Sequence, residues 1–126
     1  MKRITAIFLA VFLLLSLTAC MSNKQTGALK KITFEVTHAD GSVKEFSIQT
    51  DAETLAEALT KEGLIVESAG SAGLYDVIDG EKADWNDGEA WWCISKDGTP
   101  LSVGMKQTPL ADGDHFEAVF TRGYDQ

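Results

Sequence analysis

Cysteine and proline are scarce in this sequence, with two residues of each kind among 126. Cys20 directly follows an apolar leader, so Cys93 is the one thiol left for the folded part of the chain. One thiol can neither close a disulfide within the chain nor make a cysteine-based zinc site. If Cys20 carries a lipid, the sequence therefore excludes a disulfide framework and a cysteine-based zinc site.

Positive charge is also in short supply. The chain has 11 Lys and Arg against 19 Asp and Glu, which gives a formal net charge of −8. An acidic surface repels nucleic-acid phosphates and anionic lipid headgroups. We therefore expect no nucleic-acid partner, and solubility is sufficient to explain the excess of carboxylates.

Few residues of this chain are suited to nucleophilic catalysis. His38 and His115 are its two histidines, and each lies near a predicted turn or strand end. Cys93 could in principle form a thiol–imidazole pair with one of them. A mid-strand cysteine between Trp92 and Ile94 is, however, typical of a small, unreactive hydrophobic residue. We expect no enzyme activity.

The one long apolar run covers residues 4–17 and follows Lys2 and Arg3. It is shorter than the ~20 residues of a spanning helix but fits the ~7–15 residues of a signal-peptide core. The next residues, Leu17-Thr18-Ala19-Cys20, resemble the lipobox of bacterial lipoproteins. We expect a signal peptide over residues 1–19 and lipidation of Cys20 by a diacylglyceryl group and an amide-linked acyl chain such as palmitate. The alternative is an ordinary secretory signal with a chance cysteine.

Several acyl chains anchor a protein stably to a bilayer, whereas one chain holds it only marginally. The mature chain is therefore expected on the extracytoplasmic face of the cell membrane, attached through Cys20. Residues 20–30 are largely polar and would serve as a tether. Residues 31–126 are then left for one small domain.

The folded region opens with the pattern of a β-hairpin. Residues 32–37 alternate between apolar and polar, which is the period of a strand with one buried face. Asp40-Gly41 is a turn signal, and Phe46 and Ile48 continue the buried face on the return strand. The apolar phase changes near Lys44, where we expect a β-bulge or an offset.

One helix is expected after the hairpin. Thr50 and Glu53 form a capping-box pattern with Thr50 as the N-cap, and good helix formers follow from Ala52. Gly63 suits the left-handed residue that ends a helix, and Leu64 could fold back onto the last turn. The pattern predicts about three turns, whose leucine face must cover a sheet.

Several short strands are expected after the helix. They cover residues 64–66, 74–78, 91–96 and 115–121, with an acidic loop over 79–88 and an irregular stretch with a brief strand over 101–105. Pro100 cannot donate to a ladder and so indicates an edge or a turn. A hairpin crossed by one helix, with later strands completing a mixed sheet, is an α+β, β-grasp-like arrangement.

Aromatic residues give the strongest functional signal: Tyr75, Trp85, Trp91 and Trp92 lie close together in the sequence. Such side chains are rigid and bind flat apolar or ring-bearing ligands well. Trp91 and Trp92 point to opposite faces of their strand, so one of them must pack in a core. A core role is the alternative for every ring except Trp85, which lies in a charged loop with no periodic reason for burial.

The acidic loop also raises the question of a cation site. Residues 84–88 faintly resemble a calcium loop, and calcium prefers carboxylate oxygens. Their spacing departs from Asp-x-Asp-x-Asp-Gly, and the downstream glutamate is missing. We therefore expect a solvated loop, with no metal or cofactor bound.

Motifs spread over about residues 31–121 are similar to one bacterial family. They are Gly73-Leu74-Tyr75, Gly80, Trp91-Trp92-Cys93-Ile94 with Asp97-Gly98, Gly104-Met105, and Leu110-Ala111-Asp112-Gly113-Asp114-His115-Phe116. This is the transcobalamin-like, domain-of-unknown-function 4430 family, whose members are surface lipoproteins and modules related to the carboxy-terminal domain of transcobalamin and intrinsic factor. The resemblance implies a β-grasp-like domain over residues 31–126, cobalamin or another corrinoid as ligand, and Tyr75, Trp91 and Trp92 as contacts.

In the vertebrate transporters of that kind, the small domain closes over a corrinoid that is seated on a large helical domain. The resemblance therefore implies that a partner could supply the second wall of the site. The sequence thus leads to a lipid-anchored, extracytoplasmic module that binds a small ligand. The alternative is a cell-envelope interaction or adhesion domain, in which the same aromatic residues contact an envelope protein or a transporter subunit.

Overall fold

The computed structural model describes residues 28–70 and 73–124. The expected signal peptide, Cys20 and most of the tether lie outside the described residues, so those expectations stay predictions. Within the described part of the chain, no helix has the length and apolar character needed to cross a bilayer.

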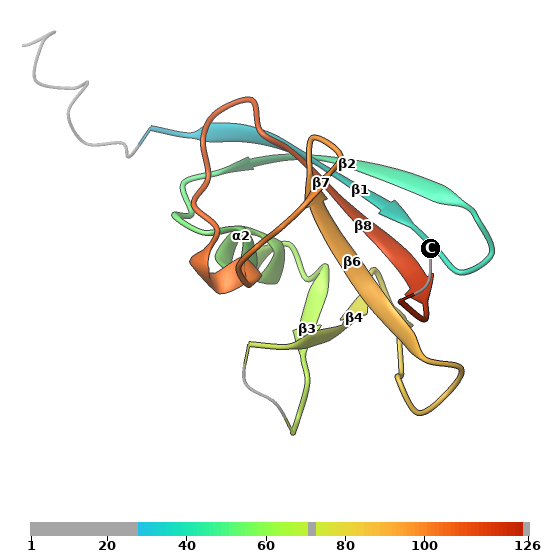
Figure 1. The fold of residues 1–126 in the computed structure, drawn as a ribbon. Coiled ribbons are helices and arrows are strands. Elements are labelled where there is room, and N and C mark those ends of the chain that lie inside the picture. Colours follow the sequence, from blue (N-terminus) through green and yellow to red (C-terminus); the bar gives the residue numbers. More distant parts are fainter. Residues whose placement is uncertain (1–27, 71–72, 125–126) are drawn as a thin grey trace, which may run out of the picture.

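A five-stranded sheet forms one side of the domain, in the order β2-β1-β8-β6-β7 (Figure 1). Its strands are β1 (Lys30–Thr37), β2 (Val43–Thr50), β6 (Ala90–Lys96), β7 (Thr99–Pro100) and β8 (His115–Arg122). Neighbouring strands are antiparallel except for β1 and β8, which run parallel. The short strand β7 lies at the edge, in agreement with the position of Pro100.

The predicted hairpin is confirmed, but the predicted bulge near Lys44 is wrong. Phe34 lies opposite Phe46, and the register continues without a shift to Thr37 opposite Val43. Val43 is 57% exposed. The change of apolar phase is therefore met by leaving one valine in solvent, which costs less than interrupting a ladder of backbone hydrogen bonds.

The helix α2 (Leu55–Lys61) begins later and is shorter than predicted. Thr50 is not its N-cap, because Thr50 ends β2 and still pairs with Lys30. Thr54 is the N-cap instead, and its hydroxyl accepts a hydrogen bond from the amide of Glu57 at 3.3 Å. The sequence carries the Thr-x-x-Glu pattern twice, and strand pairing decides which copy starts the helix.

The predicted end of the helix is confirmed. Gly63 adopts a left-handed φ of 69°, a conformation that glycine tolerates at little cost. The amide of Leu64 then donates to the carbonyl of Leu59 at 2.9 Å. This geometry brings Leu64 back onto the helix, where it is buried.

The strands after the helix do not all join the large sheet, so the single mixed sheet that we predicted is wrong. β3 (Ile65–Glu67), β4 (Tyr75–Ile78) and β5 (Glu81–Lys82) form a separate antiparallel sheet. β5 lies inside the stretch predicted as an acidic loop. The stretch 101–105 forms no strand and leads into the 3₁₀ turn η2 (Met105–Gln107).

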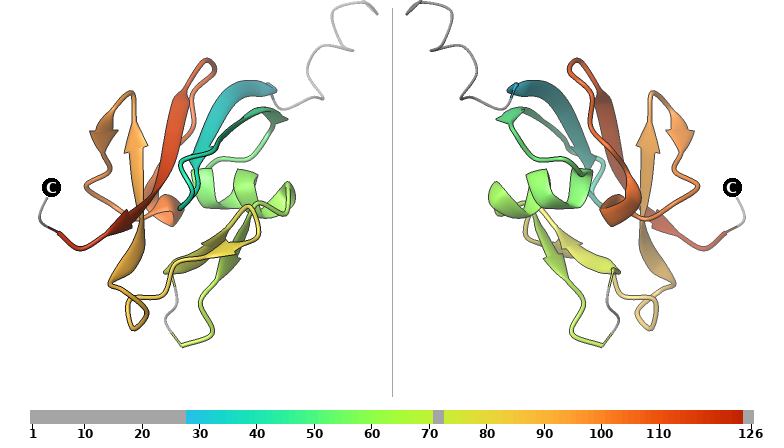
Figure 2. Two further views of the ribbon diagram at one scale, coloured as in Figure 1. Left: turned by 90° about the vertical axis from the view of Figure 1, so that its right-hand side faces the viewer. Right: turned by 90° about the vertical axis from the view of Figure 1, so that its left-hand side faces the viewer.

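The core lies between the large sheet and the elements on its inner side. Helix α2 and the small sheet both lie on that side (Figures 1 and 2). Phe34 and Phe116 from the sheet are fully buried, as are Leu55 and Leu59 from α2 and Ile78 from β4. The architecture is α+β, as predicted, and it places the small sheet opposite β6.

Candidate functional site

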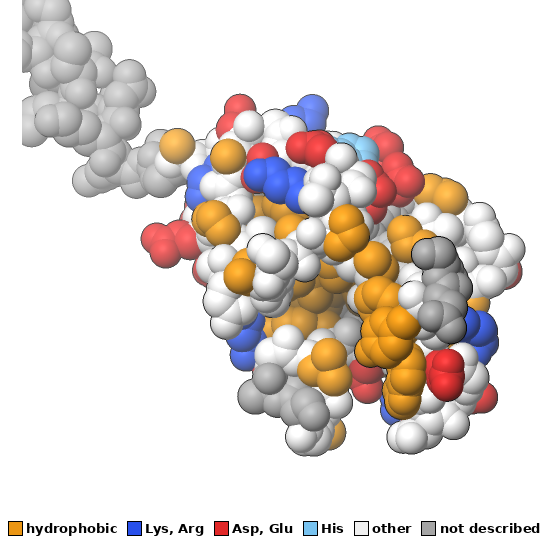
Figure 3. Space-filling model, in the orientation of Figure 1, with side chains coloured by type: hydrophobic (Ala, Val, Ile, Leu, Met, Phe, Trp, Pro, Cys, Tyr) orange, Lys and Arg blue, Asp and Glu red, His pale blue; other side chains and the backbone are white. Residues whose placement is uncertain are grey.

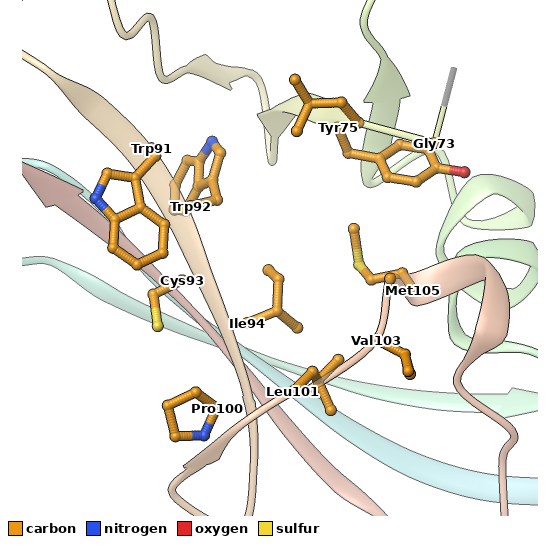
Figure 4. A pocket seen from close by; sticks show the side chains of 12 residues that line it. Gly73, Tyr75, Trp91, Trp92, Cys93, Ile94, Pro100, Leu101, Val103 and Met105 are labelled. Carbon is orange, nitrogen blue, oxygen red and sulfur yellow. The ribbon is translucent and has the colours of Figure 1, made fainter. Parts of the chain in front are cut away.

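An apolar cleft of about 410 Å³ opens beside β6 (Figure 3). It is lined by residues from three segments: Trp91, Trp92, Cys93 and Ile94 from β6, Gly73, Leu74 and Tyr75 at β4, and Pro100, Leu101, Val103, Gly104 and Met105 before and within η2. Figure 4 shows the rings of Tyr75 and Trp92 and the side chain of Met105 around this space. The lining is mostly aliphatic and aromatic, as in clefts that bind apolar molecules.

A second hollow of about 570 Å³ adjoins the apolar cleft and shares several of its residues. We call it the aromatic hollow, because five rings line it: Tyr75, Trp85, Trp91, Trp92 and Tyr124. Asp76, Lys82 and Asp84 are the charged residues of its lining. The two hollows together offer an extended apolar surface with an acidic, aromatic end.

All four aromatic residues predicted from the sequence therefore line one hollow. Tyr75 and Trp92 are only 9% and 8% exposed, so they also belong to the core. Trp91 is half-buried, whereas Trp85 is 44% exposed. Their role as ligand contacts stays a prediction, but their position is compatible with it.

Trp92 connects the two sheets. Its indole Nε1 donates to the carbonyl oxygen of Asp76 in β4 at 3.1 Å. Its ring meets Phe120 edge-on at a centroid distance of 5.4 Å and His38 at 6.2 Å. Of the two indoles of this strand, Trp92 is thus the one that packs in the core, while its face toward Tyr75 still lines both hollows.

Tyr124 lies at the exposed end of the aromatic hollow, and the sequence analysis did not identify it as a site residue. The Tyr124 ring lies 5.0 Å from the ring of Trp85 and 5.5 Å from that of Trp91. Trp91 is oriented by its Nε1, which donates to the carbonyl of Gly123 at 2.8 Å. Tyr124 follows the last strand, so no periodicity connects it with the other rings, and only the fold reveals the contact.

The loop that carries Trp85 is held by hydrogen bonds. The carboxylate of Asp84 accepts from the amide of Asn86 at 2.9 Å, and the amide of Glu89 donates to the carbonyl of Trp85 at 3.0 Å. Arg122 of β8 donates from Nη1 to the carbonyl of Asp87 at 3.1 Å. These contacts fix an exposed indole in place, which lowers the entropy cost of using it for binding.

His38 links the β1–β2 hairpin to the turn between β4 and β5. Its Nε2 lies 2.8 Å from Oδ2 of Asp79, and its Nδ1 lies 2.9 Å from Oε1 of Glu81. The Nζ of Lys44 also lies 3.3 Å from Oδ2 of Asp79. The hydrogen bond to Asp79 and the contacts with Glu81 raise the pKa of His38 above its usual range, against the opposing effect of burial.

The His38 contacts make the stability of the fold depend on pH. Because its pKa is raised on folding, the stabilisation is complete below pH 6.5 and is lost as the pH rises through the folded-state value. At pH 6 we expect His38→Gln to lower the free energy of unfolding by about 1–3 kcal/mol, and the loss should shrink by pH 9. Urea unfolding of both proteins across this range measures it. A difference that stays constant with pH would contradict the ion-pair role.

The imidazole and carboxylates of this cluster are engaged with one another. Over residues 28–70 and 73–124, no three His, Cys, Asp or Glu side chains gather in a way that could hold a metal ion. Cys93 lies on the face of β6 opposite Trp92, the residue that His38 contacts. The thiol and this imidazole are therefore separated by the sheet.

The chain is similar to proteins of known structure. No family profile and no curated protein matches the chain. The 1.30 Å crystal structure of a "putative metal binding protein" from Ruminococcus gnavus ATCC 29149 is similar, with a TM-score of 0.70 and 38% sequence identity over 75% of this chain and 99% of that one. Haptocorrin in complex with Cbi is similar in fold, with a TM-score of 0.62 and 14% identity over 79% of this chain. The match spans 27% of the haptocorrin chain.

Proposed function

This chain belongs to the same family as the Ruminococcus gnavus protein, and from the cleft that it carries we propose that it is a small-ligand-binding module of the cell surface. In this proposal the described region is a transcobalamin-like, β-grasp domain. Lipidated Cys20 holds it on the extracytoplasmic face of the membrane. The observation that carries the proposal is the convergence of five aromatic rings on a hollow that continues into an apolar cleft.

The ligand class follows from the lining. Tyr75, Trp91 and Trp92 line both hollows, so a ligand lying across them would meet ring faces and aliphatic side chains along most of its length. A large, flat, ring-bearing molecule buries the most area on such a surface. A corrinoid meets this description and agrees with the motif resemblance and with the Cbi bound by haptocorrin, the fold relative.

We do not propose a bare-ion site for this chain, although the Ruminococcus gnavus protein is described as metal binding. The described residues offer no donor set, and both ring nitrogens of His38 are within hydrogen-bond distance of carboxylates. A metal held inside an organic macrocycle would need aromatic and apolar surface from the protein and no such donor set. The corrinoid proposal is therefore compatible with a metal-containing ligand.

The proposal assigns binding and no reaction. Titration of the chain from residue 24 onward with cobalamin, with Cbi and with a cobalt salt tests it through tryptophan fluorescence. We expect saturable quenching by a corrinoid and none by the salt, because the rings and not a donor set contact the ligand. Absence of quenching beyond the inner-filter effect at millimolar ligand would favour the alternative, a cell-envelope interaction or adhesion domain.

A further inference from the structure

Strand β6 is paired along its whole length on one side only. Its residues from Ala90 to Lys96 lie opposite β8. On the other side β7 reaches only Ser95 and Lys96, and one further hydrogen bond joins the amide of Leu101 to the carbonyl of Ile94 at 2.9 Å. The first half of β6 therefore has an edge that none of the strands in residues 28–70 and 73–124 covers.

The direction of the backbone groups at this edge follows from two hydrogen bonds. The amide of Ala90 donates to the carbonyl of Asp84, and the carbonyl of Ile94 accepts from Leu101, both on the side away from β8. Because strand residues alternate, the N–H and C=O of Trp92 point the same way. Among the described residues, neither these two groups nor the N–H of Ile94 has a hydrogen-bond partner.

The apolar cleft runs along this edge. Trp91 and Cys93 project from one face of β6, whereas Trp92 and Ile94 project from the other, yet all four line the same cleft. Side chains on opposite faces of a strand can line the same cleft only if the cleft lies at the edge of the sheet, where it is open to both faces. In Figure 4 the labelled side chains accordingly lie on both sides of the β6 ribbon.

We propose that this edge is a docking site for an extended peptide segment of a partner protein, which adds as a strand to β6 between Ala90 and Ile94. The open N–H and C=O groups of Trp92 pair with its backbone, and its alternate apolar side chains enter the cleft. The site goes beyond the proposed small-ligand function, because a peptide strand is recognised by the main chain of β6 in addition to the side chains that line the cleft.

The charged residues near this edge favour a peptide segment with a basic residue at one end. The Ala90 end of the edge adjoins the aromatic hollow, where Asp76 and Asp84 face one cation, Lys82, whose Nζ lies 4.0 Å from Asp76. A basic residue at that end of the peptide is attracted to the carboxylates and to the exposed rings. A second copy of this chain carries the same net charge of −8 and is repelled.

Hydrogen exchange of the full-length chain, read residue by residue by NMR, tests the proposal. The probe is the acetylated peptide Lys-Val-Thr-Val-Thr-Val-Lys. We expect the amides of Trp92 and Ile94 to exchange fast in the free protein and at least tenfold more slowly with the peptide. The amides of Trp91 and Cys93 face β8 and serve as internal controls that are protected in both states.

Modified peptides separate strand addition from adhesion to an apolar surface. N-methylation of the valines or of the threonines blocks alternate amides, so one of the two peptides should lose binding and the other retain it. Replacing both lysines by glutamates should weaken binding at least tenfold at low salt. The proposal is overturned if Trp92 and Ile94 gain no protection at millimolar peptide, if both methylated peptides protect equally, or if the free chain is already protected there in a concentration-dependent dimer.

Discussion

Replacing Phe34 by alanine is expected to lower the free energy of unfolding by about 3–5 kcal/mol. Phe34 is fully buried and lies opposite Phe46 of β2 and Phe116 of β8, so its ring packs in the core between two neighbouring strands. Truncation removes apolar contacts and leaves a cavity that the surrounding strands cannot close. Urea unfolding followed by circular dichroism measures the loss as a lower midpoint at an unchanged slope.

The same hairpin supplies the control. Val43 is exposed on β2, so Val43→Ala should change the free energy of unfolding by less than about 0.5 kcal/mol. A loss below about 1 kcal/mol for Phe34→Ala would contradict a core centred on β1. Equal losses for both variants would mean that the hairpin contributes through its propensity and not through packing.

The strands that form this core were predictable because their signal is local. Apolar and polar residues alternate in β1 and β8, and a strand with one buried face leaves that period in its own sequence. The Asp40-Gly41 turn fixes the partner of β1 in the same local way. Nothing in these segments needs information from elsewhere in the chain.

The start of the helix was not predictable from the same kind of signal. Thr50 and Thr54 each precede a glutamate by three residues, so the sequence offers two capping boxes. Pairing of Thr50 with Lys30 and a hydrogen bond from the amide of Leu55 to the carbonyl of Thr108 decide between them. Both contacts are long-range, and intrinsic propensity is too weak to override them.

The candidate site also has parts that were predictable from local sequence and parts that depend on long-range contacts. Tyr75, Trp85, Trp91 and Trp92 could be proposed because aromatic residues crowd one stretch of sequence, and the fold does bring them to one hollow. The aliphatic wall before η2 and the ring of Tyr124 come from distant segments with no pattern of their own. The open edge of β6 was also not predictable from the sequence, because it exists only since β3, β4 and β5 form a separate sheet and do not pair with β6.

Replacing Trp85 by alanine is expected to weaken corrinoid binding about 30-fold, equivalent to about 2 kcal/mol, while the fold stays intact. Trp85 is 44% exposed, and its ring contact is with Tyr124 at the rim of the aromatic hollow. A ligand that covers this indole gains stacking and apolar contact that the core does not use. Fluorescence titration and urea unfolding of the same preparation measure affinity and stability separately.

Leu55→Ala is the matched control, because it should do the reverse. Leu55 is fully buried in α2 and lines neither hollow, so its truncation should cost about 2–5 kcal/mol of stability and leave affinity unchanged below the unfolding midpoint. If Trp85→Ala destabilised the protein as much as Leu55→Ala, the ring would be structural and the aromatic hollow would lose its principal contact. Only opposite effects of the two variants separate a residue kept for a ligand from one kept for the core.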